Sequence, residues 1–183
     1  MEKHKNEKKT VKTEEMNNIL ERTIGFVDNC DTKASIMLAL FGVLLTVLCT
    51  SKITDNVSEI VDTLKQQIGG WDYVYIVGAI ISLLLLATSV GLFILVLSAK
   101  VQISGFDSKI FFKDISENSS SRIYGKKVKT MTEDEYVNDI INQIYINAKI
   151  CTEKYERYNL ALTLGTIGSL LFIMLYIVGS LKY

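Results

Sequence analysis

The stretch DTKASIMLALFGVLLTVL, residues Asp31–Leu48, decides the fold of this chain. It opens on an acid and a base, Asp31 and Lys33, and then carries no charged residue until Lys52. A helix of about 20 apolar residues is long enough to cross the hydrocarbon core of a bilayer, roughly 30 Å thick. Three charge-free apolar blocks of this kind occur in the sequence: Ala34–Ser51, Tyr73–Ala99 and Tyr158–Leu181. The sequence therefore predicts an all-α membrane protein with three transmembrane helices.

Two alternatives to spanning helices are disfavoured by the composition. One such block could be the core of a soluble helical bundle, but three of them in 183 residues leave too little polar sequence to cover them. The first block could also be a secretory signal, but its polar leader is about thirty residues long and no small-x-small cleavage pattern ends it. We therefore expect an uncleaved membrane anchor.

The lysines and arginines predict the topology. Seven lie before or at the start of the first block, ten lie between Lys100 and Arg157, and only Lys52, Lys65 and Lys182 lie elsewhere. Cytoplasmic loops of membrane proteins carry the excess of basic residues. We therefore expect a multi-pass protein of the inner membrane, with a cytoplasmic N-terminus and an outer C-terminus. Lys33 would lie at the cytoplasmic interface, where it can reach the lipid headgroups, and Asp31 could pair with a base on a neighbouring helix.

The boundaries that we predict follow from these blocks and from the polar segments between them. They are a disordered basic leader (1–12), an amphipathic helix continuing into the first span (13–51), a short outer loop (52–72), the second span (73–103), a cytoplasmic loop segment (104–131), and an amphipathic helix continuing into the third span (132–181).

Apolar residues recur at three- and four-residue steps just before the first and third spans. The residues are Met16, Ile19, Leu20, Thr23, Ile24, Val27 and Cys30 in the first helix, and Val137, Ile140, Ile141, Ile144, Ala148, Cys151 and Tyr155 in the last. Thr132 and Glu135 have the spacing of a capping box at the start of the last helix. Each apolar stripe must be covered, so we expect both helices to form a cytoplasmic stalk. Adsorption to the membrane surface is the alternative, but the polar faces mix acids and bases.

The segment between the second and third spans is rich in loop signals, with Gly105, Asn118–Ser121 and Gly125. Within it, Phe111 and Phe112 lie between two lysines. Aromatic rings beside cations suit a nucleotide, because the rings stack on the base and the charge binds the phosphate. They suit a small interfacial core equally well.

Small residues recur four apart in all three spans. The pairs are Ser35 and Ala39, Gly78 and Ser82, Ala87 and Gly91, and Gly165 and Ser169. Such spacing lets helices approach closely, so these faces are expected to hold the spans together or to join subunits of a homo-oligomer. No span has a charged residue near its middle, which disfavours a transporter or proton pump.

Several functional classes are excluded or disfavoured by residue content. The net charge is zero and the basic residues are interleaved with acids, so we expect no nucleic acid polymer as a partner. The three cysteines have no metal-ligand spacing, and His4 is the one histidine, which removes most hydrolase and metalloenzyme templates. We expect no catalytic residue, metal or cofactor.

The sequence resembles the transmembrane effectors of Pycsar, the bacterial anti-phage systems that signal with cyclic pyrimidine nucleotides. The similarity covers about Met16 to Ser180. It is carried by D-x-K-A-S followed by LALFGVLLTVL (Asp31, Lys33, Ala34, Ser35), by F-F-x-D-I (Phe111, Phe112, Asp114, Ile115), and by the late helix T-x-x-E-Y…D-I-x-x-Q-I…K-I…K-Y (Thr132, Glu135, Tyr136, Asp139, Ile140, Gln143, Ile144, Lys149, Ile150, Lys154, Tyr155). Lys113 stands where the family often has glycine.

The resemblance implies a non-enzymatic effector. A partner cyclase would make cUMP or cCMP upon infection, the effector would bind it, and the membrane would be permeabilised in an abortive infection. Related effectors of other systems answer to cyclic dinucleotides, so the nucleotide stays open. Because a ligand shifts a conformation only where it binds one state more tightly, we expect its site to join elements that move. The predicted contacts are Arg22, Asp31, Lys33, Phe111, Phe112, Lys113, Lys149, Lys154 and Arg157.

Two other functions are weighed against this one. A structural or accessory membrane protein whose cytoplasmic helices bind a protein partner would need no pocket. A small-molecule channel or carrier would need a polar lining. The spans offer few polar residues for one: Thr46, Ser82, Thr88, Ser89, Thr163, Thr166 and Ser169.

Overall fold

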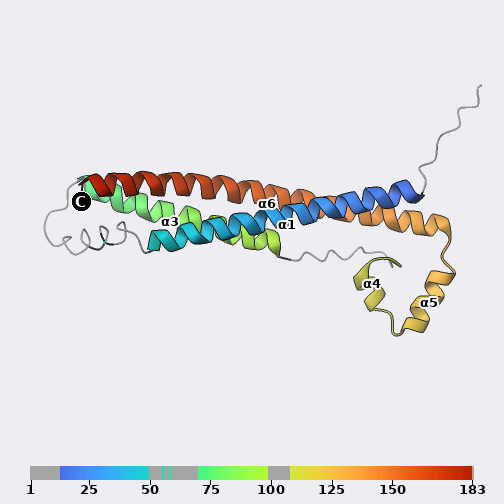
Figure 1. Cartoon of the computed structure of the whole chain (residues 1–183). Helices are drawn as coiled ribbons and strands as arrows, with labels where there is room; N and C mark the ends of the chain where they lie inside the picture. Colours follow the sequence, from blue (N-terminus) through green and yellow to red (C-terminus); the bar gives the residue numbers. More distant parts are fainter. Residues whose placement is uncertain (1–12, 50–54, 56–57, 59–69, 99–107, 183) are drawn as a thin grey trace, which may run out of the picture. The chain divides into compact units, whose positions relative to one another are not determined.

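The structure is a computed structural model that describes residues 13–49, 55, 58, 70–98 and 108–182. Its helices are α1 (Thr13–Cys49), α3 (Gly70–Leu97), α4 (Phe112–Ser116), α5 (Ser121–Lys129) and α6 (Glu133–Lys182), and these described ranges contain no strand (Figure 1). Three of them, α1, α3 and α6, are long and apolar enough to cross a membrane. The predicted all-α class with three transmembrane helices is confirmed.

The chain divides into two compact units. The loop unit consists of residues 1–28 and 100–152, and the spanning unit consists of residues 29–99 and 153–183. Both α1 and α6 are continuous across the division, since proline, the residue that most disrupts a helix, is absent from the sequence.

In the spanning unit, α3 packs against α6 through two hydrogen bonds. Ser82 Oγ donates to the carbonyl oxygen of Gly168 (3.0 Å), and Ser89 Oγ donates to that of Ala161 (2.7 Å). The residue numbers rise along one helix as they fall along the other, so the two helices are antiparallel. Both serines are buried, and such bonds between spanning helices contribute about 0.6 kcal/mol each.

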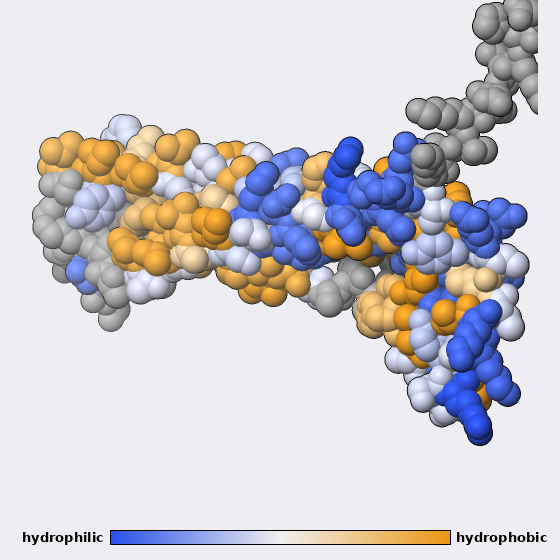
Figure 2. Space-filling view, turned by 45° about the vertical axis from the view of Figure 1, so that its right-hand side comes forward, coloured by the Kyte–Doolittle hydropathy of each residue, from blue (hydrophilic) through white to orange (hydrophobic). Residues whose placement is uncertain are grey.

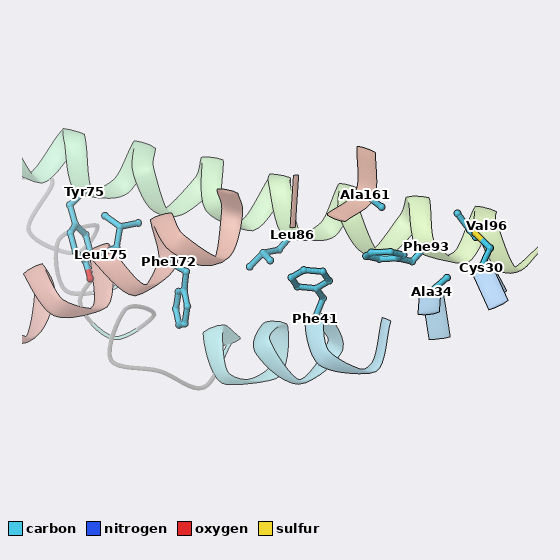
Figure 3. Close-up of a cluster of buried hydrophobic side chains, with 10 residues drawn as sticks. All are labelled: Cys30, Ala34, Phe41, Tyr75, Leu86, Phe93, Val96, Ala161, Phe172 and Leu175. Atoms are coloured by element: carbon cyan, nitrogen blue, oxygen red, sulfur yellow. The ribbon is translucent and has the colours of Figure 1, made fainter. Parts of the chain in front are cut away.

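The core of the spanning unit combines aromatic rings with small residues. Phe93 of α3 stacks on Phe41 of α1, with centroids 5.8 Å apart, and meets Tyr158 of α6 edge-on at 5.7 Å. Figure 3 shows Phe41 and Phe93 among the ten buried residues of this core: Cys30, Ala34, Phe41, Tyr75, Leu86, Phe93, Val96, Ala161, Phe172 and Leu175. On the face seen in Figure 2, hydrophobic side chains cover most of the outer surface of this unit, as a lipid-facing surface requires.

The small-residue pairs divide into two groups. A β-carbon at Gly78 would lie 3.2 Å from Leu175, and Ser82 and Gly165 are buried, so these residues do hold spans together. The pairs Ser35–Ala39 and Ala87–Gly91 are exposed, so they do not hold together the helices that the structure describes in the spanning unit.

The loop unit is more helical than the sequence suggested. The expectation that Gly125 marks a loop is wrong, because Gly125 lies inside α5. The Ser120 side chain caps α5 by accepting a hydrogen bond from the amide of Ile123, and three lysines in the last turn complement the helix dipole. Together these outweigh the roughly 1 kcal/mol that one internal glycine costs. Gly105 lies outside the described residues.

The start of α6 matches its predicted capping box. The amide of Thr132 donates to Glu135 Oε2 (3.1 Å), and the amide of Glu135 donates to Thr132 Oγ1 (3.3 Å).

The second spanning helix, α3, begins at Gly70, three residues before the predicted span. Asp72 lies in its first turn, where a negative charge is favoured. The leader 1–12 and most of the loop 52–72 lie outside the described residues.

Candidate functional site

An ion pair joins α1 and α6 in the spanning unit. Lys154 Nζ donates to both carboxylate oxygens of Asp31, at 2.5 and 2.7 Å. The Lys154 side chain is 6% exposed and that of Asp31 is 35% exposed. A buried ammonium is stable only when it is paired and hydrogen-bonded. The carboxylate of Asp31 provides both the counter-charge and the hydrogen-bond acceptors for the buried Lys154.

Further cations accompany this pair. Lys33 Nζ lies 5.8 Å from the ring centroid of Tyr155, a cation–π contact from α1 to α6. Arg157 lies three residues after Lys154 on α6, a spacing that makes neighbours on a helix surface. We call Asp31, Lys33, Lys154, Tyr155 and Arg157 the rim cluster. Three cations and an aromatic ring with one partly exposed carboxylate are a chemistry that suits an anion such as a phosphate.

In the loop unit, a buried polar network fixes the chain that leads into α4. Asp139 of α6 accepts hydrogen bonds from Ser108 Oγ (2.6 Å) and from the amide of Lys109 (2.7 Å). Ser108 Oγ in turn accepts bonds from the amide of Phe111 (3.0 Å) and from Gln143 Nε2 (3.4 Å). Because Ser108, Asp139 and Gln143 are all buried and hydrogen-bonded, this network holds the turn on α6.

A second layer of contacts supports the same turn from its exposed side. Lys109 Nζ lies 2.9 Å from Glu135 Oε2, and the Tyr124 hydroxyl of α5 donates to the carbonyl of Lys109 (3.0 Å). The hydrogen bond from Lys109 and the amide of Thr132 lower the pKa of Glu135. The carboxylate therefore stays charged at neutral pH and keeps both partners.

The turn presents an aromatic pair. The rings of Phe111 and Phe112 have centroids 4.7 Å apart, and Phe112 is 64% exposed. The exposed ring of Phe112 is accessible, and both interpretations of this motif, a site that stacks on a base and a small interfacial core, stay open. Lys113 follows directly and is half-buried.

Two other predicted contacts, Arg22 and Lys149, belong to the loop unit. Arg22 is exposed on α1, and Lys149 is exposed on α6 with its Nζ 5.4 Å from the ring of Tyr145. Within the spanning unit, the structure therefore brings Asp31 to Lys154. Within the loop unit it brings Phe111 to Phe112. Among the described residues, no group of His, Cys, Asp and Glu could hold a metal ion.

Sequence reasoning missed the polar network of Ser108, Asp139 and Gln143. We expected the apolar stripe of this helix to be covered, but the buried residues of α6 also include Asp139, Gln143 and Lys154, whereas Ile141 and Ala148 of that stripe are exposed. One signal existed: Asp139 and Gln143 are four residues apart, hence on one helix face, within a run of isoleucines. Their partner Ser108 lies 31 residues before Asp139 and 35 before Gln143, and no feature of the sequence around Ser108 pointed to this contact.

Fold and charge pattern define a membrane protein with three spanning helices and a cationic rim cluster. Residues 15–180 match the family model described as the Pycsar effector protein domain. The chain belongs to this family, whose members are effectors of anti-phage defence. It is 30% identical over 177 residues to the Pycsar effector protein GmPycTM of Gulbenkiania mobilis, which covers 88% of this chain and 90% of that protein. The chain matches no solved structure.

Proposed function

We propose that this effector senses a cyclic nucleotide, cUMP or cCMP, made by a partner cyclase, and then disrupts the inner membrane in an abortive infection. The observation that carries the proposal is the rim cluster. Its cations lie on α1 and α6 where their apolar blocks begin, so a change at the cluster acts directly on two spanning helices. We expect the N-terminus in the cytoplasm, where the nucleotide is made, and the C-terminus outside.

The ion pair offers a route from binding to motion. The cyclic phosphate is an anion, and it competes with Asp31 for the ammonium of Lys154. Lys33 and Arg157 favour the phosphate further. A ligand changes a conformation only by binding one arrangement more tightly. If Lys154 turns from Asp31 to the ligand, the ion pair between α1 and α6 is lost, which favours another packing of the two helices.

The loop unit contains the remaining predicted contacts, and we keep them as predictions. Phe111 and Phe112 are suited to stack on a base, because the exposed face of Phe112 is held in place through the turn that Asp139 fixes. Arg22, Lys113 and Lys149 are half-buried or exposed cations. The proposed function requires no catalysis, so each of these residues would act by binding alone.

Dye release from liposomes containing the purified protein tests the proposal. The vesicles are titrated with cUMP, cCMP, cAMP, cGMP and a set of cyclic dinucleotides, after correct insertion has been verified. We expect release with one pyrimidine nucleotide. Silence with every nucleotide would contradict the proposal and favour an accessory protein that binds a protein partner. Release with a cyclic dinucleotide alone would keep the effector and change its signal.

Substitutions test the rim cluster separately. Lys33→Ala removes a cation without disturbing the core, since Lys33 is exposed, and should abolish or strongly weaken the response at unchanged expression and insertion. Lys149→Ala tests the predicted contact in the loop unit in the same way. Lys126→Ala, an exposed cation in α5, is the matched control and should respond normally. An unchanged dose–response in both test variants would rule out these residues as ligand contacts.

A further inference from the structure

The side of α6 that faces away from the core changes character along its length. Four exposed polar residues follow each other at three- and four-residue steps and so share one side of the helix: Glu156, Asn159, Thr163 and Thr166. We call them the α6 polar face. Further along, the same side carries the exposed apolar residues Leu170, Ile173 and Ile177. From Asn159 onward this side lies within the apolar block Tyr158–Leu181, where a surface that only hydrocarbon covers would be apolar, so Asn159, Thr163 and Thr166 need another explanation.

The hydrogen-bond donors and acceptors on the α6 polar face are only partly satisfied within the chain. The hydroxyls of Thr163 and Thr166 donate to carbonyls one turn earlier in their own helix, each at 2.8 Å, and keep lone pairs that can accept. The Asn159 side chain makes no hydrogen bond to any residue that the structure describes, and only its backbone carbonyl accepts one, from Thr163. Its amide is both donor and acceptor, and hydrocarbon chains can serve neither role.

A second copy of the chain fits this surface. All copies insert in one orientation, so two α6 helices that meet are parallel. In a symmetric pair, the same residue of each copy then lies at the same depth and faces its counterpart. An asparagine opposite an asparagine can donate and accept at once, and threonines at the next two turns can extend the contact. We propose that the α6 polar face is the surface through which copies of this chain associate in the membrane.

Glu156 adds a repulsive element to the same surface. It lies one turn before Asn159, outside the apolar block, and is exposed. The symmetry that pairs the asparagines also brings two like carboxylates together, which opposes association. The association would therefore be weaker than its hydrogen bonds alone provide. Neutralising Glu156 should strengthen association, whereas removing the Asn159 amide should weaken it.

Cysteine cross-linking of the full chain in liposomes tests the surface. Thr163→Cys is compared with Thr88→Cys on α3, a matched control because Thr88 is also exposed and also donates to its own helix, to Leu84 at 2.7 Å. Their depths are similar, since the neighbouring Ser89 bonds to Ala161. The unmodified chain measures the background from the native cysteines, and Thr88→Cys measures random collision. We expect several-fold more cross-linked dimer from Thr163→Cys than from Thr88→Cys.

A second substitution in the Thr163→Cys chain tests whether the polar side chains of Asn159 and Glu156 determine how strongly the copies associate. In the Thr163→Cys chain, Asn159→Leu should lower the cross-linked fraction and Glu156→Gln should raise it. Equal cross-linking of Thr163→Cys and Thr88→Cys would overturn the proposal. A cross-linked fraction that neither Asn159→Leu nor Glu156→Gln changes would also overturn it.

Dye release measured on the same vesicles separates this surface from the proposed function. Selective cross-linking without leakage for any nucleotide would support the surface and contradict membrane disruption. Leakage without selective cross-linking would overturn the surface and leave the proposed function standing.

Discussion

Gly165 of α6 and Phe41 of α1 are packed so closely that no side chain fits at residue 165. A β-carbon there would lie 2.6 Å from Phe41 Cζ and 2.6 Å from Ser89 Oγ of α3, shorter than real contacts of such atoms. Neither neighbour can easily move, because Phe41 stacks on Phe93 and Ser89 is bonded to Ala161. The three spanning helices therefore meet at Gly165.

Gly165→Ala should destabilise this packing by about 1–3 kcal/mol, the usual cost of inserting a methyl group into a filled core. The measurement is the unfolding midpoint in mixed detergent micelles. Gly91→Ala is the control, since nothing lies within 4 Å of a β-carbon at Gly91. If Gly165→Ala and Gly91→Ala lower the unfolding midpoint equally, Gly165 is not in close contact with Phe41 and Ser89.

The Asp31–Lys154 pair should respond asymmetrically to the loss of either partner. Asp31→Asn leaves an ammonium that is 6% exposed without its counter-charge, whereas Lys154→Met leaves a carboxylate that is 35% exposed and can be hydrated. Breaking a fully buried pair costs about 3–5 kcal/mol, and screening at the partly exposed side reduces this. We expect Asp31→Asn to lower the free energy of unfolding more than Lys154→Met. The reverse order would contradict the burial of Lys154.

Asp139→Ala should release the turn that carries Phe111. It leaves the buried Ser108 hydroxyl without its acceptor, at a cost of about 1–3 kcal/mol, and the half-buried Lys109 amide loses its acceptor at a smaller cost. Faster hydrogen exchange at the Lys109 amide is the expected readout. Asn138→Ala, at the exposed neighbouring position, is the control and should leave that exchange rate unchanged.

The Glu135 contact makes a prediction about pH. Its pKa in the folded chain lies below the ordinary value of 4.5, chiefly because of the hydrogen bond with Lys109. A depressed carboxylate pKa stabilises the folded state above the unfolded value, and this contribution is lost as the pH falls through the folded pKa. An NMR titration of the Glu135 carboxyl should therefore show the low pKa, and Lys109→Met should raise it. No change in Lys109→Met would remove Lys109 as the cause.

The sequence predicted the helices better than their contacts. Charge-free blocks longer than a bilayer core predict spanning helices whatever their partners, and the capping box of Thr132 and Glu135 depends on residues three apart. The prediction of a loop at Gly125 was wrong, because one internal glycine destabilises a helix less than an N-cap and a cationic last turn stabilise it. The polar network of Ser108 could not be predicted, since its members are distant in the sequence.

By itself, the sequence determined that this chain is an all-α membrane protein with three spanning helices, because hydrophobicity and length are local properties that a bilayer selects directly. Only the tertiary structure decided which small and charged residues meet. It placed Gly165 against Phe41 and left Gly91 open, although both belong to the same kind of motif. It also paired Lys154 with Asp31, because the register of two parallel helices is set by packing over their whole length and not by any one stretch.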